Sequence, residues 1–343
     1  MEQIQIKGSS LDQTASRALR RAVMVFESPE LIRSLAQILT SFGPFLAICA
    51  ARYAWPDMPI WLMAICTVLG GGFVVRIFII QHDCGHGSFF QQRWANDLLG
   101  HICSLVTFTP YAHWRRQHAG HHANWNNLDR RANVDLYSTC LTVDEYRAMS
   151  PWQRFTTRFV RHPLFSLVLL PPCVFLLLYR TPFDSPKGWE RERRNVYLTN
   201  LALLVMIVGL GLVFGFAQVA LVQLPILAVS SIVGVWLFSV QHRFEDTLWR
   251  GNENWSAFDA SLQGSSYLKL PRVLQWFTGN IGFHHVHHLS PRVPNYRLEA
   301  CHRALPQLQD APVLNLRAGL TNWRWALWDE VNQRMVPFSA AWK

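Results

Sequence analysis

Four long runs of apolar residues dominate the hydropathy pattern of this chain. They form two pairs, and within each pair only two residues separate the runs: Leu35–Trp55 and Met58–Ile80, then Val196–Phe216 and Val219–Val240. A helix needs about 20 mostly apolar residues to cross roughly 30 Å of hydrocarbon, so each run is long enough to span a membrane. Four such runs favour an integral membrane protein over a soluble protein with buried core helices. The pattern predicts four transmembrane helices in two hairpins.

Two shorter apolar runs fall below or near this length. Leu98–Pro110 contains His101, and Pro163–Tyr179 is interrupted by Pro171 and Pro172. We expect each of them to lie in the membrane interface or to re-enter rather than to span. The glycines Gly70, Gly71 and Gly72 lie inside the second long run, where close packing between helices is the expected role.

Basic residues orient the hairpins. Arg52 is the only basic residue near the first short connector, and the second connector has none. Lysines and arginines instead flank the other ends of the runs: Lys7, Arg17, Arg20, Arg21, Arg33, Arg93, Arg115, Arg116, Arg130, Arg131, Arg180, Lys187, Arg191, Arg193 and Arg194. The positive-inside bias therefore places both termini and the middle of the chain in the cytoplasm. Arg76, inside the second run, is expected to extend its side chain to the lipid headgroups.

The sequence thus predicts an all-α integral membrane protein with one domain over residues 1–343. Hairpins at 35–80 and 196–240 would carry a cytoplasmic cap made of residues 81–195 and 241–343. The net charge of +10 fits an anionic membrane surface or an acidic soluble partner, and we expect no nucleic-acid partner. The seven cysteines fall mostly in apolar stretches, which argues against a disulfide framework. The first 30 residues show no compact apolar core typical of a secretory signal.

Histidines carry the candidate chemistry. Of the 14 in the chain, most fall into three clusters: His82 and His86, then His118, His121 and His122, then His284, His285, His287 and His288. Spacings of three and four place side chains on one face of a helix, so the imidazoles of a cluster can point at one centre. His242 stands two residues after the fourth run, as His82 stands two residues after the second. These two histidines should therefore emerge at a similar depth.

Clustered imidazoles indicate a metal site, because neutral imidazole is the commonest metal ligand and charged histidines repel one another. A zinc site needs four ligands, so nine candidates exceed one such ion and suit two ions with open positions. Imidazole accepts iron, copper or zinc, and open positions near a membrane favour oxygen chemistry at iron. His113 lies half a turn off the second cluster and is left out, whereas helix geometry alone does not exclude His285. His101, His162 and His302 are interpreted as ordinary surface or core histidines.

These motifs resemble the membrane fatty-acid desaturases. HDCGH at 82–86, HAGHH at 118–122 and HHVHH at 284–288 are similar to the three histidine boxes of that family, in the same order. The flanking segments QHRFEDT at 241–247 and QGSSYLKLPRVLQWFTGNIGFHHVHHLSPRVPNY at 263–296 are similar as well. The resemblance covers about residues 35–300.

The resemblance implies a mushroom-like fold, with four spanning helices and a cytoplasmic cap that holds two irons. Motif matching then implies nine ligands and passes over His285: His82, His86, His118, His121, His122, His242, His284, His287 and His288. It also implies use of dioxygen and an external reductant to place a cis double bond in an acyl chain. His284 opens the third box where front-end desaturases usually have glutamine, and no His-Pro-Gly-Gly haem motif occurs. The chain therefore looks like an acyl-lipid desaturase with a separate donor such as ferredoxin. With no visible transit peptide, a bacterial inner membrane is expected.

Selectivity for methylenes requires a shaped apolar tunnel, because methylenes offer nothing to hydrogen-bond. Carboxylates near the imidazoles should orient them, and the candidates are Asp83, Asp129, Asp135, Glu245 and Asp246. Two alternatives stay open. A hydroxylase or ketolase of the same histidine-rich superfamily would share the boxes and hairpins. The second alternative is a metal transporter or a non-catalytic metal-binding membrane protein. A transporter would place its ligands near the bilayer midplane, whereas these clusters lie outside the apolar runs.

Overall fold

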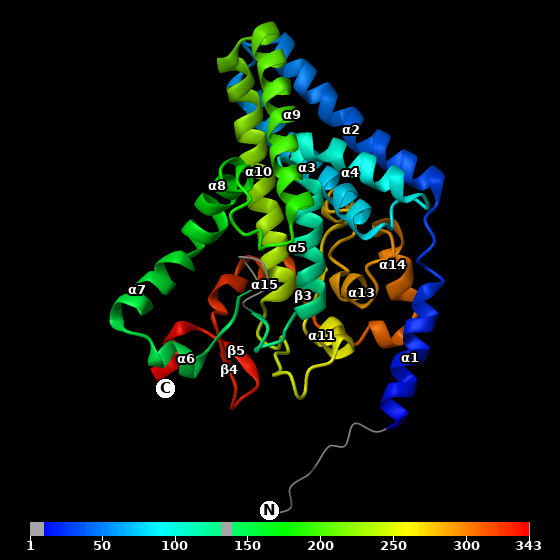
Figure 1. Cartoon of the computed structure of the whole chain (residues 1–343), viewed down its shortest axis with the longest axis vertical. Helices are drawn as coiled ribbons and strands as arrows, with labels where there is room; N and C mark the ends of the chain where they lie inside the picture. Colours follow the sequence, from blue (N-terminus) through cyan, green and yellow to red (C-terminus); the bar gives the residue numbers. More distant parts are fainter. Residues whose placement is uncertain (1–9, 132–138, 343) are drawn as a thin grey trace, which may run out of the picture.

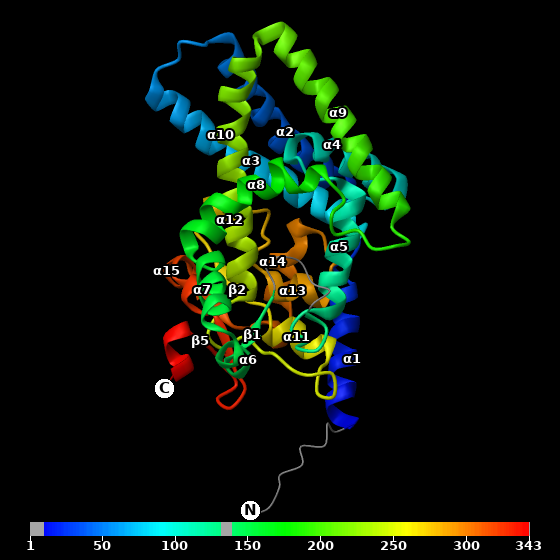
Figure 2. The same cartoon turned by 60° about the vertical axis from the view of Figure 1, so that its left-hand side comes forward.

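The computed structural model describes residues 10–131 and 139–342, and four long helices dominate its upper half. These helices are α2 (Leu31–Ala54), α3 (Ile60–His86), α9 (Glu190–Phe214) and α10 (Phe216–His242). In the described part of the chain, they are the four unbroken helices long and apolar enough to cross a membrane. The prediction of four helices able to span a membrane is thereby confirmed. Figures 1 and 2 show them above a broader assembly of shorter elements.

The central pair of long helices is α3 and α10, which pack directly on each other. Glycines permit this close approach. A Cβ atom on Gly70 would lie 3.0 Å from the side chain of Ile226, and one on Gly71 would lie 2.5 Å from Val229. The expected packing role of these glycines is confirmed. α2 packs on α3, and α9 packs on α10.

Arg76 does not reach the lipid headgroups, so that expectation is wrong. The residue is buried, with 7% of its surface exposed. Its guanidinium lies 3.9 Å from the ring centroid of Trp276 and donates to the Trp276 carbonyl oxygen. Burial of a charged group is costly unless it is paired or hydrogen-bonded, and the aromatic face and the carbonyl supply that compensation. Arg76 therefore joins α3 to the neighbouring helix α12 (Arg272–Phe277).

The lower half, which we call the cap, is built from short helices around the C-terminal ends of α3 and α10 (Figure 1). Its helices are α1 (Ser10–Met24), α5 (Tyr111–Asn124), α6 (Val143–Ala148), α11 (Ala257–Gln263), α12, α13 (His284–Leu289), α14 (Asn295–Ala304) and α15 (Leu316–Leu320). Single 3-10 turns cover Pro306–Leu308, Asn322–Arg324 and Phe338–Trp342. A buried cluster that includes Leu19, Val286 and Leu298 holds α1, α13 and α14 together.

Five short strands also occur in the cap, which the expectation of a purely α-helical chain did not include. β1 (Leu141–Thr142), β4 (Leu327–Asp329) and β5 (Arg334–Val336) form a sheet in the order β1-β4-β5, parallel and then antiparallel. β2 (Tyr267–Lys269) pairs in parallel with β3 (Val313–Asn315). Each strand has two or three residues, too few to show the alternation by which strands are predicted.

The two shorter apolar runs form helices of their own. Leu98–Pro110 lies mostly in α4 (Arg93–Thr107), which packs on α3. The second run follows α7 (Pro151–Val160) and comprises a π-helical turn (Leu164–Leu169), α8 (Leu170–Leu176) and a 3-10 turn (Leu178–Arg180). It is bent by 47° from α7, the geometry of a broken span or a re-entrant segment, and α8 packs on α10.

Candidate metal centre

The first two candidate histidines lie on the last turn of α3. This helix continues six residues beyond the predicted apolar run and ends at His86, and Gly87 follows in the left-handed conformation with φ of 69°. Glycine adopts this conformation without the steric cost of a Cβ atom. The ring centroids of His82 and His86 lie 4.7 Å apart on one helix face, as the spacing predicts.

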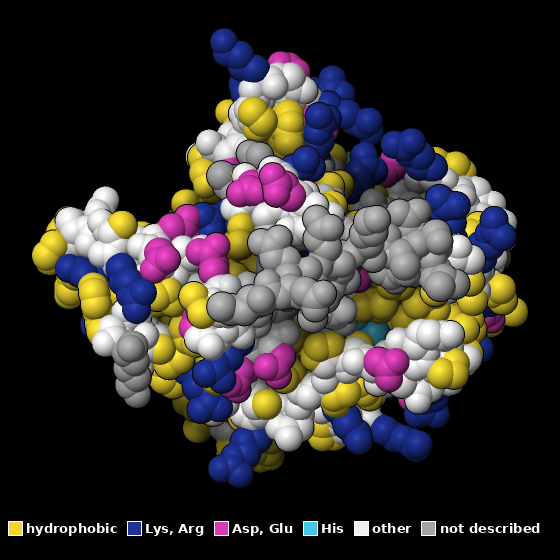
Figure 3. Space-filling view, turned by 90° about the horizontal axis from the view of Figure 1, so that it is seen from below, with side chains coloured by type: hydrophobic (Ala, Val, Ile, Leu, Met, Phe, Trp, Pro, Cys, Tyr) yellow, Lys and Arg dark blue, Asp and Glu magenta, His cyan; other side chains and the backbone are white. Residues whose placement is uncertain are grey.

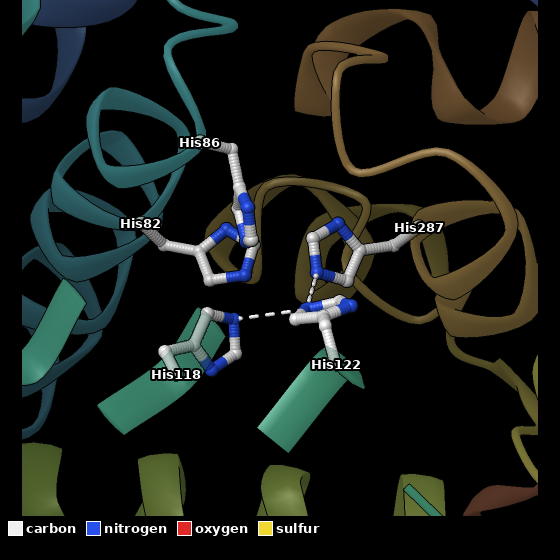
Figure 4. A group of neighbouring side chains, drawn as sticks. All are labelled: His82, His86, His118, His122 and His287. Atoms are coloured by element: carbon white, nitrogen blue, oxygen red, sulfur yellow. Dashed lines mark hydrogen bonds between the residues drawn. The ribbon is translucent and has the colours of Figure 1, made fainter. Parts of the chain in front are cut away.

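Five imidazoles from three helices form the first histidine group, shown in Figure 4. It consists of His82 and His86 of α3, His118 and His122 of α5, and His287 of α13, and one nitrogen of each lies within 4.8 Å of the others. The Nε2 atom of His122 lies 3.1 Å from that of His118 and 3.0 Å from that of His287.

The second histidine group lies beside the first. It contains His121 of α5, His242 at the end of α10 and His288 of α13. His284 adjoins it, with its Nε2 atom 2.9 Å from that of His242 and 3.1 Å from that of His288. The stacked rings of His122 and His288, with centroids 4.3 Å apart, connect the two groups. All nine sequence-predicted histidines therefore meet in one region.

Burial keeps five of these imidazoles neutral. Burial is the main cause of their lowered pKa values, and the neighbouring imidazoles are the next. The pKa lies well below the ordinary histidine value for His118, His122, His284, His287 and His288. A histidine must be neutral to donate a lone pair to a metal, so low pKa values leave these ligands ready at neutral pH.

The spacing of the nitrogens fits metal ligation. Two nitrogens at about 2.1 Å from one ion lie about 3.0 Å apart when the angle between them is 90°, and about 3.4 Å apart at a tetrahedral angle. Five Nε2 pairs are separated by 2.9–3.1 Å, which matches the right-angled arrangement. Nε2 of His86 is buried and has no hydrogen-bond partner in the described part of the chain. The donor set therefore fits two metal ions with five or six ligand positions each better than closed tetrahedral zinc sites.

Asp83 is the candidate carboxylate that contacts an imidazole. Its Oδ1 atom lies 3.2 Å from Nδ1 of His82, and its Oδ2 atom accepts hydrogen bonds from the backbone and side-chain nitrogens of Asn295, at 2.7 and 2.8 Å. Such partners fix the tautomer and the orientation of a ligating ring. The other candidates lie elsewhere: Asp129 accepts from Asn252, Glu245 faces Arg334, Asp246 is exposed, and Asp135 is outside the described residues.

The remaining histidines point away from both groups. Nε2 of His285 lies 3.0 Å from Nδ1 of His302, and burial lowers the pKa of His285 to about 3. Nε2 of His113 lies 2.9 Å from a carboxylate oxygen of Asp184. His101 adjoins Asn195, and His162 is exposed. Helix spacing alone did not exclude His285 as a member of the third cluster. Its ring is directed toward His302 of α14 and away from both histidine groups.

Two tryptophans beside the histidines were missed by the sequence reasoning. The ring of Trp114 stacks on His118 with centroids 4.6 Å apart, and the centroid of Trp125 lies 4.0 Å from that of His242. Both carried a usable signal, because Trp114 precedes His118 by four residues and Trp125 follows His121 by four. That spacing predicts each tryptophan on the helix face that its histidine occupies; Trp114 lies on α5, and Trp125 directly follows the end of that helix.

A cavity of about 1060 Å³ adjoins both groups and is walled by α3, α5, α8 and α10. His82, His118 and His284 form part of its wall. Most of the remaining lining is apolar and includes Phe78 and Phe238, and a few charged and amide side chains, among them Arg116 and Gln117, complete it. An elongated apolar ligand of low polarity fits such a space beside the histidines.

Comparisons with known proteins agree with this site. The model of the protein family described as "Fatty acid desaturase" matches residues 58–318. A "Fatty acid desaturase" of Bacillus subtilis is 43% identical over 324 residues, which cover 94% of this chain and 91% of the relative. An "sn-1 oleoyl-lipid 12-desaturase" of Synechocystis is 27% identical over 80% of this chain and 76% of its own. An "sn-1 acyl-lipid omega-3 desaturase (ferredoxin)" of Nostoc is 29% identical over 75% of this chain and 69% of its own.

Proposed function

Since the chain belongs to the fatty acid desaturase family, we propose that it introduces a cis double bond into an acyl chain of a membrane lipid, using dioxygen and an external reductant. The observation that carries this proposal is the long apolar cavity that reaches His82, His118 and His284. A cavity of this kind suits a substrate composed of methylenes, and two of the helices that wall it, α3 and α10, are long and apolar enough to span a membrane.

We assign two iron ions to the two histidine groups. His82, His86, His118, His122 and His287 would hold one ion, and His121, His242, His284 and His288 would hold the other. When bound, the pair supplies activation of dioxygen and the oxidising power to remove two hydrogens from adjacent methylenes. The spacing of the closest nitrogen pairs and the neutral state of His118, His122, His284, His287 and His288 support this assignment.

The residues of the chain itself supply position and a dry environment. Phe78, Phe238 and the other apolar side chains of the cavity hold the acyl chain against the histidine wall and exclude water from it. Asp83, fixed by Asn295, holds the imidazole of His82 in one orientation. Trp114 and Trp125 pack against imidazoles and restrict their movement.

We further propose a soluble electron donor such as ferredoxin and a cytoplasmic cap in a bacterial inner membrane. The relative from Nostoc is named for ferredoxin. A net charge of +10 favours an acidic partner, and Figure 3 shows Lys and Arg side chains around the rim of the cap seen from below. The basic residues that flank the long helices away from their short connectors support the orientation.

Lipid analysis of a host that lacks the product tests the reaction. With the chain and a suitable donor expressed, saturated or monounsaturated acyl lipids should give products two mass units lighter, only in the presence of oxygen. The variant His284→Ala should abolish the change. Products sixteen mass units heavier would identify a hydroxylase instead, and altered carotenoids with unchanged acyl lipids would identify a ketolase.

A further inference from the structure

The cavity follows one face of α10 from the histidines into the membrane-spanning part of the molecule. The cavity-lining residues of α10 recur every three or four positions, from Leu227 through Gly234 to Gln241, which precedes His242. At 1.5 Å per helical residue, the stretch from Leu227 to Gln241 is about 21 Å long. An extended chain lying along this face therefore passes well beyond the histidines.

The two ends of the cavity differ in polarity. Among the lining residues, Arg116 and Gln117 precede His118 on α5 and Gln117 hydrogen-bonds to Asp184, so the polar groups lie together. Val74 and Leu227 instead lie eight and fifteen residues before His82 and His242 on α3 and α10, and we take these two sets to mark the two ends. Burying a polar headgroup or ester without hydrogen-bond partners is costly, so the polar part of a lipid belongs at the first end. The methyl end of the acyl chain then occupies the second end, which we call the deep end.

The deep end is apolar in effect and lies beside a close contact between two helices. The hydroxyl groups of Ser230 and Ser231 line it but donate to backbone carbonyl oxygens of their own helix, at 3.0 and 2.9 Å. Close to these serines, α3 and α10 touch at Gly71 and Val229, where a Cβ atom on the glycine would lie 2.5 Å from the valine. The space available to the methyl end is therefore limited by side-chain volume along α10.

We propose that Gly234 sets the length of acyl chain that fits beyond the histidines. It lies eight residues before His242, or about 12 Å along the helix axis. Gly234 lines the cavity, and a Cβ atom added to it would meet no neighbouring atom within 4 Å. A larger side chain at this position thus projects into the acyl space without displacing packed protein. This inference rests on the proposed function, because it assumes that the cavity holds an acyl chain.

The variant Gly234→Leu tests the proposal, with Gly209→Leu as its matched control. Gly209 also lies in a long apolar helix and has no neighbouring atom within 4 Å of an added Cβ, but it is exposed on α9 and does not line the cavity. We compare desaturation of lipids carrying stearoyl and myristoyl chains. One methylene too many in an apolar pocket costs tenfold or more in selectivity, so Gly234→Leu should lower the stearoyl-to-myristoyl ratio by at least about tenfold. Gly209→Leu should leave it unchanged.

Equilibrium binding of radiolabelled stearic and myristic acids to the purified proteins separates this inference from the proposed function. A loss of stearic acid binding confined to the Gly234 variant supports the inference even if the protein desaturates neither chain. If Gly234→Leu fails to fold, Gly234→Ala should show a smaller change in the same direction. An unchanged ratio and unchanged binding in the Gly234 variants, or an equal change in Gly209→Leu, would overturn it.

Discussion

The contact between Asp83 and His82 gives the sharpest prediction about metal binding. Asp83 is 2% exposed, accepts two hydrogen bonds from Asn295 at 2.7 and 2.8 Å, and lies 3.2 Å from Nδ1 of His82. The substitution Asp83→Asn keeps the shape but removes the charge, and its NH₂ group must face either the donors of Asn295 or the His82 ring. Loss of such a partner of a metal ligand weakens metal binding by about 10- to 100-fold. That corresponds to about 1.4–2.7 kcal/mol.

Competition with a chelator measures this effect. Purified wild type and Asp83→Asn are titrated with an iron chelator, and the iron that stays with the protein is quantified at each concentration. The variant should release iron at a chelator concentration about 10- to 100-fold lower than the wild type. Asp129→Asn is the control, because Asp129 also accepts a backbone hydrogen bond at 2.7 Å, from Asn252, but contacts no imidazole in the described structure. If Asp83→Asn and Asp129→Asn both release iron at the same chelator concentration as the wild type, Asp83 does not orient a ligand.

Three further outcomes are expected. Purified protein should contain close to two irons per chain, and His121→Ala should lose iron while His113→Ala keeps it; one zinc and no iron would contradict the assignment. Gly71→Leu should lower thermal stability in detergent by an amount equivalent to about 1–3 kcal/mol, because its side chain meets Val229, whereas Gly209→Leu should not. Reporter fusions near Lys187 and at the C-terminus should both read cytoplasmic, and opposite readings would require the bent α7–α8 segment to span the membrane.

Local spacing was sufficient to predict which histidines share a face. His82 and His86 share one helix face because α3 continues through both of them. The helix itself was predicted from the apolar run that precedes these histidines. The glycines at 70 and 71 were also interpretable from sequence, since small residues inside an apolar helix indicate a close neighbour.

Relations between distant segments were not accessible in this way. His118, His121 and His122 belong to one cluster in the sequence, yet His121 joins His242 while its neighbours join His82. That division depends on where α10 meets α5, and no single segment encodes it. Arg76 was misjudged for the same reason, because its partner Trp276 lies 200 residues further along the chain.

The uninterrupted course of α3 has a consequence for how this enzyme can change in evolution. Val74 and Val75 at the cavity and His82 at the candidate metal centre are carried by one helix without a break. Inserting or deleting one residue between them would rotate the imidazole by about 100° and shift it by about 1.5 Å relative to the cavity wall. Length changes in α3 would therefore destroy the site instead of moving it. Divergence in substrate preference among descendants of this chain should proceed by exchange of side-chain volume along the cavity, at constant helix length.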